Sequence, residues 1–193
     1  MATKAPAAPS ARERLLAAAS ELFYAEGVHT VGIDRVIERA GVAKASLYNT
    51  FGSKDELVRA YLEGKHAQMA GRITRYIERY DTPREKLLGV FEAQAESFAA
   101  PGFRGCAFVS ASAESPGELV EQAADEYRGW VRALLVDLSR EAGVASADVL
   151  GRQLHMIYDG ASLSARMDHD PTASVAARAA AETLLDAALA GRA

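Results

Sequence analysis

The segment at residues 33–51, IDRVIERAGVAKASLYNTF, constrains the fold of this chain more than any other. Apolar residues at helical spacing predict the inner stripe of a first short helix: Ile33, Val36, Ile37 and Ala40. Gly41 follows, and glycine readily adopts the left-handed conformation in which many helices end. A second helix is expected over residues 44–51. Two short amphipathic helices joined at a glycine are typical of a helix-turn-helix motif.

The second of these helices is expected to have two different faces. Leu47 and Phe51 lie four residues apart and predict its buried side. The opposite side is compact, polar and aromatic, and it comprises Lys44, Ala45, Tyr48 and Asn49. Small side chains let a helix lie deep in the major groove of DNA, where bulky ones would hold it away from the base edges. An ordinary solvated helix pair is the alternative explanation of the same spacing.

Helix signals continue along the rest of the chain. Ser10 and Glu13 have the capping-box spacing, and Gly27 ends the helix that they begin. Ser53 and Glu56 repeat this spacing before a long helix that starts at about residue 54. Later helices are expected at about residues 83–98, 106–114, 118–142, 146–167 and 171–190.

No segment shows sustained period-two alternation between hairpin turns, so we expect an all-α fold of about nine helices. The expected organisation has three parts. Residues 1–9 are rich in Ala and Pro and predict a flexible start. Residues 10–54 form the helix-turn-helix domain, and residues 55–193 form a second helical domain.

Composition sets limits on the class of protein. The net charge is -4, with a net of +1 in residues 1–60 and -5 in residues 61–193, which permits DNA binding through local placement of charge without arguing for it. The single cysteine, Cys106, excludes an internal disulfide and a multi-cysteine zinc site. The charged start is unlike a signal peptide, and no later apolar run is long enough to span a membrane. We therefore expect a cytoplasmic protein.

Few residues suggest catalysis or metal binding. The sequence has no phosphate-binding glycine loop, no metal-spaced Cys/His cluster and no nucleophile elbow, so we expect neither a cofactor nor a metal. His155 and Asp159 are four residues apart and fit either a metal or acid–base pair or a hydrogen bond at a helix surface or pocket. Cys106 fits a redox or electrophile sensor, if Arg104 lowers its pKa, or a small buried hydrophobe.

Two sets of residues in the second domain have a structural and a functional explanation. The aromatic and sulfur-containing side chains, among them Trp130, Met156 and Tyr158, fit either a core or the wall of a ligand cavity. The last two helices are rich in small residues, which let another helix approach closely. Packing within one chain would explain them, as would a four-helix interface between two copies. The expected dimer residues are Leu154, Ile157, Ala161, Ala176, Ala180, Thr183, Leu184 and Ala187.

The segment GVHTVGIDRVIERAGVAKASLYNTFGSKDELV resembles the N-terminal signature of the TetR family of bacterial transcriptional regulators. The resemblance is carried by Ala-Gly-Val, by Leu-Tyr followed by Phe, and by Ser-Lys-Asp-Glu-Leu. It covers about residues 10–62, whereas residues 63–193 match only in helical pattern. The resemblance implies that the second domain binds a ligand and forms the dimer. The cavity residues expected on that basis are Phe91, Ala95, Phe98, Phe103, Cys106, Phe108, Trp130, Leu134, His155, Met156 and Asp159.

The resemblance also implies roles for residues near the turn. Lys44, Ala45 and Asn49 fall where the family's recognition helix faces base edges, and Tyr48 where an aromatic hydroxyl reaches phosphate or base. The rest of the implied DNA-contacting set is Ser46, Thr50, Lys54 and Gly32. Thr50 and Lys54 occupy phosphate-binding positions, and Lys54 lies at a helix N-terminus that favours an anion. Gly32 departs from the usual Ser or Thr, so only its backbone amide is left to contact phosphate there.

The functional expectation is a homodimeric DNA-binding regulator, most simply a repressor that a small molecule releases from a palindromic operator. The expected partners are double-stranded DNA, an unidentified small-molecule effector and a second copy of the chain, without a membrane. A different class of function is a helical small-molecule-binding or scaffold protein whose helix pair contacts another protein. An enzyme acting at His155 and Asp159 is the third. Salt-sensitive binding to DNA distinguishes the first from the other two.

Overall fold

The structure is a computed structural model that describes residues 8–191, and nine helices occupy this range. Their bounds are α1 Ala11–Glu26, α2 Ile33–Ala40, α3 Lys44–Phe51, α4 Lys54–Ile77, α5 Pro83–Phe98, α6 Ala107–Glu114, α7 Glu118–Glu141, α8 Ala147–Met167 and α9 Ala173–Ala190. No strand occurs within residues 8–191, so the all-α prediction is confirmed. The expected flexible start lies outside the described residues except for positions 8 and 9.

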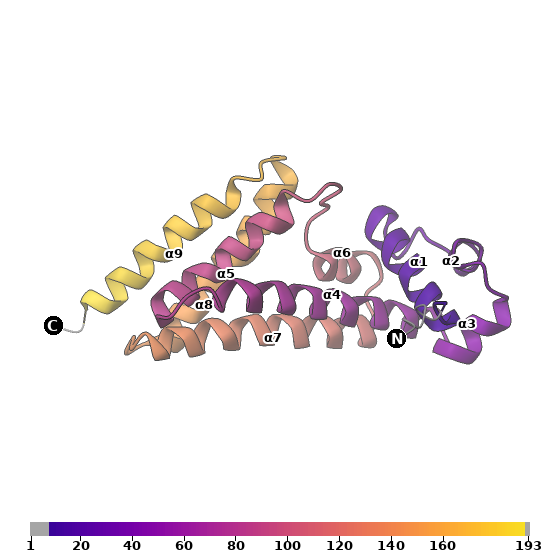
Figure 1. Ribbon diagram of the computed structural model, residues 1–193, viewed down its shortest axis with the longest axis horizontal. Coiled ribbons are helices and arrows are strands. Elements are labelled where there is room, and N and C mark those ends of the chain that lie inside the picture. The colour runs from indigo at the N-terminus through magenta and orange to yellow at the C-terminus, as the bar shows by residue number, and fades with distance from the viewer. Residues whose placement is uncertain (1–7, 192–193) are drawn as a thin grey trace, which may run out of the picture.

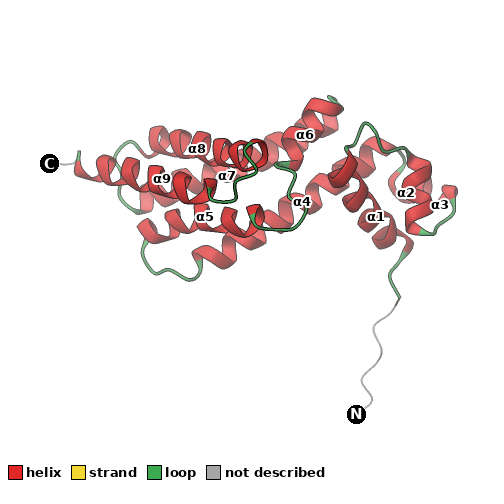
Figure 2. Cartoon of the chain, turned by 90° about the horizontal axis from the view of Figure 1, so that it is seen from above, coloured by secondary structure: helices red, strands yellow, loops and turns green. Residues whose placement is uncertain are grey.

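The helices form two groups that α4 joins. Helices α1, α2 and α3 cluster at one end of the molecule, and α4 runs from that cluster along the length of the rest (Figure 1). Helix α7 lies beside α4, while α5, α8 and α9 pack together at the other end. The view from above shows the same separation, with α6 between the two groups (Figure 2). Helices α4 and α6 therefore connect the two groups.

Helix starts follow the predicted capping residues. The Ser10 hydroxyl accepts a hydrogen bond from the Glu13 amide at 3.2 Å, and the Glu13 carboxylate accepts one from the Ser10 amide at 2.7 Å. This is a complete capping box. At α4 the Ser53 hydroxyl accepts from the Glu56 amide at 3.1 Å, without the return bond. These caps satisfy amides that have no partner within their own helix.

One continuous apolar core extends through the chain, and α4 contributes to it along most of its length. Near its start, Tyr61 packs edge-on against Phe23 of α1, with the ring centroids 5.7 Å apart. Towards its end, Ile73 is buried among the helices of the other group. Because α4 belongs to both, the division at residues 54 and 55 stays a prediction.

Helices α7 and α8 pack closely at Gly151. A Cβ atom at Gly151 would lie 2.4 Å from Val136 Cγ2 and 3.0 Å from Val136 Cα. Real Cβ atoms essentially never come within 3.0 Å of a non-bonded heavy atom. The absence of a side chain at Gly151 therefore allows α7 and α8 to pack this closely. Within residues 8–191, none of the helices has the length and apolar character needed to cross a membrane.

Candidate functional site

The turn between α2 and α3 has the geometry that the sequence predicts. Gly41 adopts the left-handed conformation, with φ 62° and ψ 45°. Its amide donates to Glu38 O at 3.1 Å, and the Val42 amide donates to Ile37 O at 3.3 Å. These bonds satisfy carbonyls at the end of α2 while the chain changes direction. The turn thus fixes how α3 leaves α2.

Helix α3 is anchored on one side and open on the other. Leu47 is completely buried, and Phe51 is half-buried beneath the guanidinium of Arg12, which lies 5.3 Å from the ring centroid. Tyr48 is 46% exposed. The other exposed members of the predicted outer face are Lys44, Ala45 and Asn49. The two-faced helix predicted from spacing is therefore observed, whereas the DNA contacts assigned to it stay predictions.

The remaining residues of the predicted DNA-contacting set lie around this face. Ser46, Thr50 and Lys54 are half-buried, and the Thr50 hydroxyl donates to Ser46 O at 2.6 Å. Lys54 is the first residue of α4. Gly32 is exposed at the N-cap of α2, where no side chain caps the helix. The hydroxyl proton of Thr50 is thus already used inside α3, which leaves its oxygen as an acceptor.

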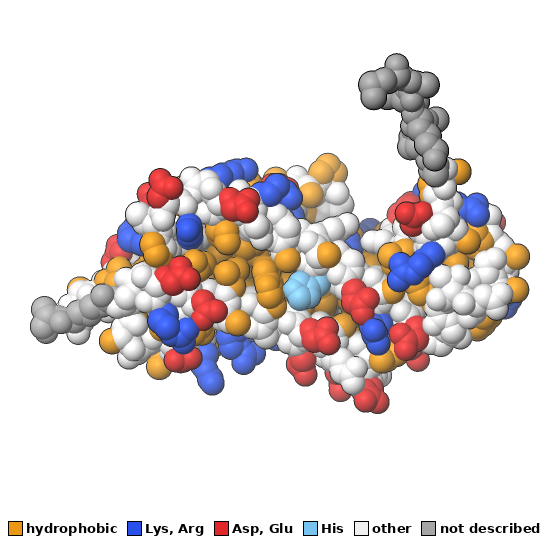
Figure 3. Space-filling view, turned by 60° about the horizontal axis from the view of Figure 1, so that its bottom comes forward, with side chains coloured by type: hydrophobic (Ala, Val, Ile, Leu, Met, Phe, Trp, Pro, Cys, Tyr) orange, Lys and Arg blue, Asp and Glu red, His pale blue; other side chains and the backbone are white. Residues whose placement is uncertain are grey.

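Several cations of this end of the molecule are already paired. Arg39 binds Glu21 at 2.8 Å, and Arg35 binds Glu26, so two ion pairs fix α2 to α1. Lys44 Nζ lies 2.9 Å from Asp34 Oδ1, and this hydrogen bond raises the pKa of Lys44. Exposed pairs of this kind contribute little to stability and exchange readily for other anions. On the face shown in Figure 3, basic and acidic side chains are interspersed.

Arg12 is a residue that sequence reasoning missed. It is exposed in the first turn of α1, its guanidinium stacks on Phe51 at the end of α3, and it forms none of the ion pairs found within residues 8–191. Lys54 likewise forms none of these pairs. Arg12 beside the end of α3 and Lys54 at the start of α4 are therefore not paired with a carboxylate within residues 8–191. A basic residue two positions after the Ser10 cap was the available signal.

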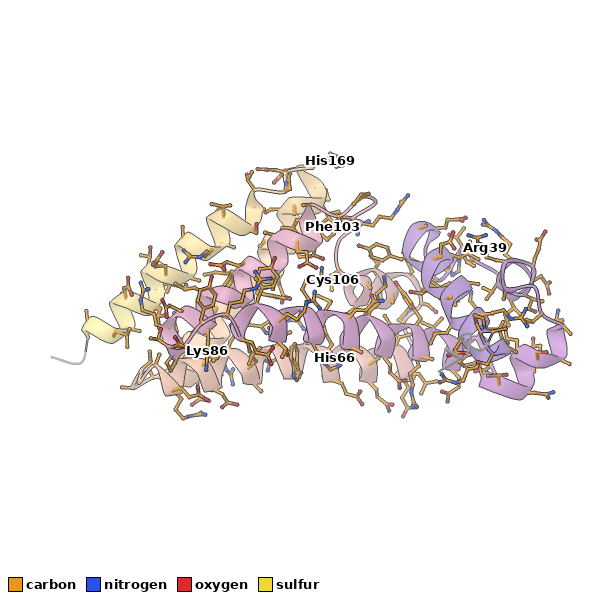
Figure 4. All side chains as sticks on the ribbon, viewed as in Figure 1. Arg39, His66, Lys86, Phe103, Cys106 and His169 are labelled. Carbon is orange, nitrogen blue, oxygen red and sulfur yellow. The ribbon has the colours of Figure 1, made fainter. Side chains whose placement is uncertain are left out.

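A cavity of about 230 Å³ lies between α4, α5, α8 and the segment that joins α5 to α6. Four of the predicted ligand residues line it: Phe98, Phe103, Cys106 and Asp159. Phe98 and Phe103 pack with their ring centroids 5.1 Å apart. Figure 4 shows Phe103 and Cys106 in the connecting segment above α4. Their role in binding a ligand stays a prediction.

The other predicted ligand residues lie elsewhere. Phe91, Ala95, Phe108, Trp130, Leu134, His155 and Met156 do not line this cavity. Phe108 stacks on Tyr127 with the centroids 4.2 Å apart, so it is a core residue. Met156 is 74% exposed on α8, which contradicts its assignment to a cavity wall. The cavity is lined instead by side chains that the sequence analysis did not select, including Tyr24, Lys65, Arg72 and Gln94.

The surroundings of Cys106, and of the pair His155 and Asp159, do not favour a sensor or a metal site. Burial raises the pKa of the Cys106 thiol, which contradicts the lowered pKa that a thiolate sensor requires. His155 Nε2 lies 3.7 Å from Asp159 Oδ2, too far for a hydrogen bond, while Arg128 binds that oxygen at 2.8 Å. Burial lowers the pKa of His155. No cluster of three or more His, Cys, Asp or Glu suited to a metal occurs within residues 8–191.

Two contacts join the cavity wall and α6 to the first helices. The Tyr24 hydroxyl on α1 donates to Gly105 O at 3.2 Å and accepts from the Arg104 amide at 3.0 Å. The Glu114 carboxylate at the end of α6 accepts a hydrogen bond from the His29 amide at 3.4 Å. Tyr24 also lines the cavity. A change in the cavity therefore has a direct hydrogen-bonded path to α1.

The predicted dimer residues divide between the core and the surface. Leu154 and Ala161 are buried within the chain itself, so their assignment to an outer surface is wrong. Ile157 and Leu184 are half-buried, and the exposed members of the set are Ala176, Ala180, Thr183 and Ala187. Within residues 8–191, five of the seven exposed large hydrophobic side chains lie on α8 and α9: Val149, Met156, Leu163, Met167 and Val175. The exposed apolar side chains of α8 therefore lie on a different side of the helix from the predicted dimer residues.

The fold and the exposed α3 face define a helix-turn-helix DNA-binding protein with an attached helical domain. Residues 15–61 match the family model described as bacterial regulatory proteins, tetR family. The crystal structure of SCO4454, a TetR-family transcriptional regulator from Streptomyces coelicolor, is 34% identical, with a TM-score of 0.86 over 92% of this chain and 95% of that one. The chain belongs to the TetR family of bacterial transcriptional regulators.

Two curated relatives from Mycolicibacterium smegmatis match part of the chain. The HTH-type transcriptional activator FasR is 37% identical over 42% of this chain and 37% of its own length. The HTH-type transcriptional repressor KstR2 is 32% identical over 50% of this chain and 48% of its own length. The matched segments thus span less than half of either relative. One is named an activator and the other a repressor, so similarity to these relatives does not determine the direction of regulation.

Proposed function

We propose that the protein is a homodimeric, ligand-responsive DNA-binding regulator, a repressor that a small molecule releases from a palindromic operator. The observation that carries the proposal is the outer face of α3, where Tyr48 is exposed while the neighbouring Leu47 is buried. A helix held in this way presents side chains to base edges without rearranging its own core. Membership of the family supports the same function.

On DNA, α3 would lie in the major groove. The Asn49 amide is suited to pair with an adenine edge, and Tyr48 would contact base or phosphate. Lys54 lies at the N-terminus of α4, where free amides also favour a phosphate, and Arg12 borders the same edge. Lys44 would exchange Asp34 for a DNA acceptor. Two copies would place their α3 helices in successive major grooves about 34 Å apart, which requires a palindromic or nearly palindromic site.

The dimer would form through the outer faces of α8 and α9. This surface combines large apolar side chains on α8, such as Val149 and Met156, with small ones on α9, such as Ala180. Large residues on one helix and small ones on the next allow close packing of two helices from each copy. An apolar surface of this kind is otherwise costly to leave in water.

The effector would occupy the cavity beside α4. It would release DNA only if it binds the DNA-incompetent arrangement more tightly than the DNA-bound one. Helix α4 lines the cavity through Lys65 and begins beside α3 at Lys54, so a displacement of this helix reaches the DNA-contacting face. The hydrogen bonds of Tyr24 provide a second connection.

The direct test is a mobility-shift titration with the DNA upstream of the protein's own gene, at several stated salt concentrations. The wild type should bind with an affinity that falls steeply as salt rises, because phosphate contacts release counterions. Tyr48→Ala should lose specific binding while keeping helix content, and Glu141→Ala, an exposed change on α7, should bind as the wild type does. Wild-type affinity in Tyr48→Ala would remove the assignment of α3 to base contacts.

The dimer surface has its own test by sedimentation. Ala180→Glu would place an unpaired charge in the proposed interface and should yield monomers with weak DNA affinity. Ala133→Glu, at an exposed position of α7, is the matched control and should remain dimeric. A dimer that persists in Ala180→Glu places the interface elsewhere.

A further inference from the structure

The wall of the cavity carries more positive than negative charge. Lys65 and Arg72 stand two turns apart on α4, and Arg166 on α8 lines the cavity as well. None of the ion pairs within residues 8–191 includes any of these three cations. The cavity's one carboxylate, Asp159, is already bound by Arg128 at 2.8 Å. The cavity thus lacks an anion to balance its cations.

Lys65 is half-buried and lies against two aromatic rings. Its ammonium lies 4.1 Å from the centroid of the Tyr24 ring and 5.7 Å from that of Tyr61, so aromatic faces are its contacts. Burial, followed by repulsion from Arg72, lowers the pKa of Lys65. A negative group between these two side chains would relieve both effects.

Most of the remaining wall is apolar. Its main apolar members are Met69, Ile73, Phe98, Phe103 and Leu163. An occupant without an apolar body would leave this surface in contact with water, at a cost proportional to the area. The cavity therefore suits a molecule that is apolar along most of its length and anionic at one point.

Gln94 adds a second polar requirement to the wall. Its Nε2 donates to Tyr158 O at 2.9 Å. Because a backbone carbonyl only accepts hydrogen bonds, this contact fixes which end of the amide is nitrogen. Among residues 8–191, Gln94 Oε1 has no hydrogen-bond partner although it is buried, and a buried acceptor left unpaired costs free energy. The Tyr158 hydroxyl is neutral at ordinary pH, since burial raises its pKa to about 12.

We propose that the cavity binds an amphipathic carboxylate, whose anionic group lies between Lys65 and Arg72 and whose far end carries a hydroxyl that donates to Gln94. The apolar body packs along Met69, Phe98 and Phe103. The proposal rests on the proposed function only in taking this cavity as the effector site. The binding chemistry is independent of DNA.

The test measures binding to the full chain by calorimetry, in the absence of DNA, with three probes of one length used as monomers. Decanoate should bind at least about tenfold more tightly than decyltrimethylammonium, which has a similar apolar chain and the opposite charge. The ω-hydroxylated form of decanoate should bind more tightly than decanoate. If decyltrimethylammonium binds as tightly as decanoate or more tightly, the proposal of an anionic ligand is overturned. If the ω-hydroxyl group does not raise the affinity, the proposed role of Gln94 is overturned.

Variants locate the site. The double variant Lys65→Met with Arg72→Met keeps the apolar stems, and it should lose about tenfold in decanoate affinity together with the preference over the cation. Lys86→Met is the matched control, because Lys86 lies on α5 away from Phe103 and Cys106 and does not line the cavity (Figure 4). Circular dichroism should show the same helix content in all variants. Unchanged decanoate affinity in the double variant would overturn the proposed site.

A mobility shift with decanoate separates this proposal from the proposed function. Calorimetric binding without any change in DNA affinity would support the ligand class and count against the regulatory role of the cavity. DNA binding by a chain that does not bind decanoate would leave the regulator intact and overturn the ligand class.

Discussion

The exposed face of α3 and the cavity beside α4 are built in opposite ways. The face of α3 belongs to one helix of eight residues, so the burial of Leu47 by itself determines that Tyr48 and Asn49 point outward. The cavity takes its wall from α4, α5, α8 and a connecting segment, and its members, such as Lys65 and Arg166, are distant in sequence. Helical phase therefore defines the face of α3, whereas the cavity depends on how several helices are rotated against one another.

The largest expected effect separates anchoring from contact within α3. Leu47→Ala should lower the free energy of unfolding by about 2–5 kcal/mol, because it removes a completely buried side chain and leaves a cavity. Tyr48→Ala, one residue further on, should change it by no more than about 0.5 kcal/mol. Denaturant titrations of both variants measure the difference. Equal stabilities would mean that α3 does not depend on one anchored side.

The next effect tests the packing that sets the second region. Gly151→Ala should destabilise the protein by about 1–3 kcal/mol, because the added Cβ meets the backbone of Val136 on α7. Gly129→Ala on α7 is the control, since nothing lies within 4 Å of a Cβ there. That change should stabilise the chain by about 0.5–1 kcal/mol through helix propensity. An unchanged free energy of unfolding in Gly151→Ala would show that α7 and α8 can move apart without loss of stability.

The contrast between a face set by one helix and a cavity set by several explains which features could be predicted from the sequence. The capping residues, the left-handed Gly41 and the two faces of α3 depend on neighbours a few positions away, and all were predictable. Helix α8 was different, because apolar residues occur on both of its sides. Leu154 and Met156 are similar in sequence terms, yet Leu154 is buried and Met156 is 74% exposed. Periodicity gives no reason to choose between them until α7 and α9 are in place.

The cavity shows the same limit more strongly. The aromatic residues Phe91, Phe108 and Trp130 were predicted to line the cavity, but they do not. Its distinctive polar members are Lys65, Arg72 and Gln94, and in sequence each resembles an ordinary polar residue of a surface helix. Only the approach of α4, α5 and α8 brings them to one cavity. A site assembled from distant residues therefore requires the fold before its chemistry can be inferred.

A smaller effect is expected where the two regions meet. Tyr24→Phe removes a hydroxyl that binds both Gly105 O and the Arg104 amide but keeps the ring beneath Lys65. It should cost about 0.5–1.5 kcal/mol of stability and speed hydrogen exchange of the Arg104 amide. Tyr76→Phe on α4 is the control. Unchanged exchange at Arg104 would show that this contact does not hold the connecting segment to α1.

The smallest effect concerns Gly32, the N-cap of α2. Its φ of -77° and ψ of 157° suit any residue, and nothing lies within 4 Å of a Cβ there. Gly32→Ser should raise the free energy of unfolding by a few tenths of a kcal/mol, up to about 1 kcal/mol, because the hydroxyl can accept from an amide that α2 leaves unpaired. Gly32→Ala adds the same carbon without an acceptor and should be the least stable of the three, since alanine is a poor N-cap.

Thermal unfolding of the wild type, Gly32→Ser and Gly32→Ala, followed by DNA titration, distinguishes capping of α2 from contact with DNA. If the serine hydroxyl only caps α2, stability rises and DNA affinity stays unchanged. If it also reaches a phosphate, affinity rises and its salt dependence steepens. An alanine variant as stable as the serine one would contradict the capping argument, and would show that even in the locally determined region some positions are decided by more distant packing.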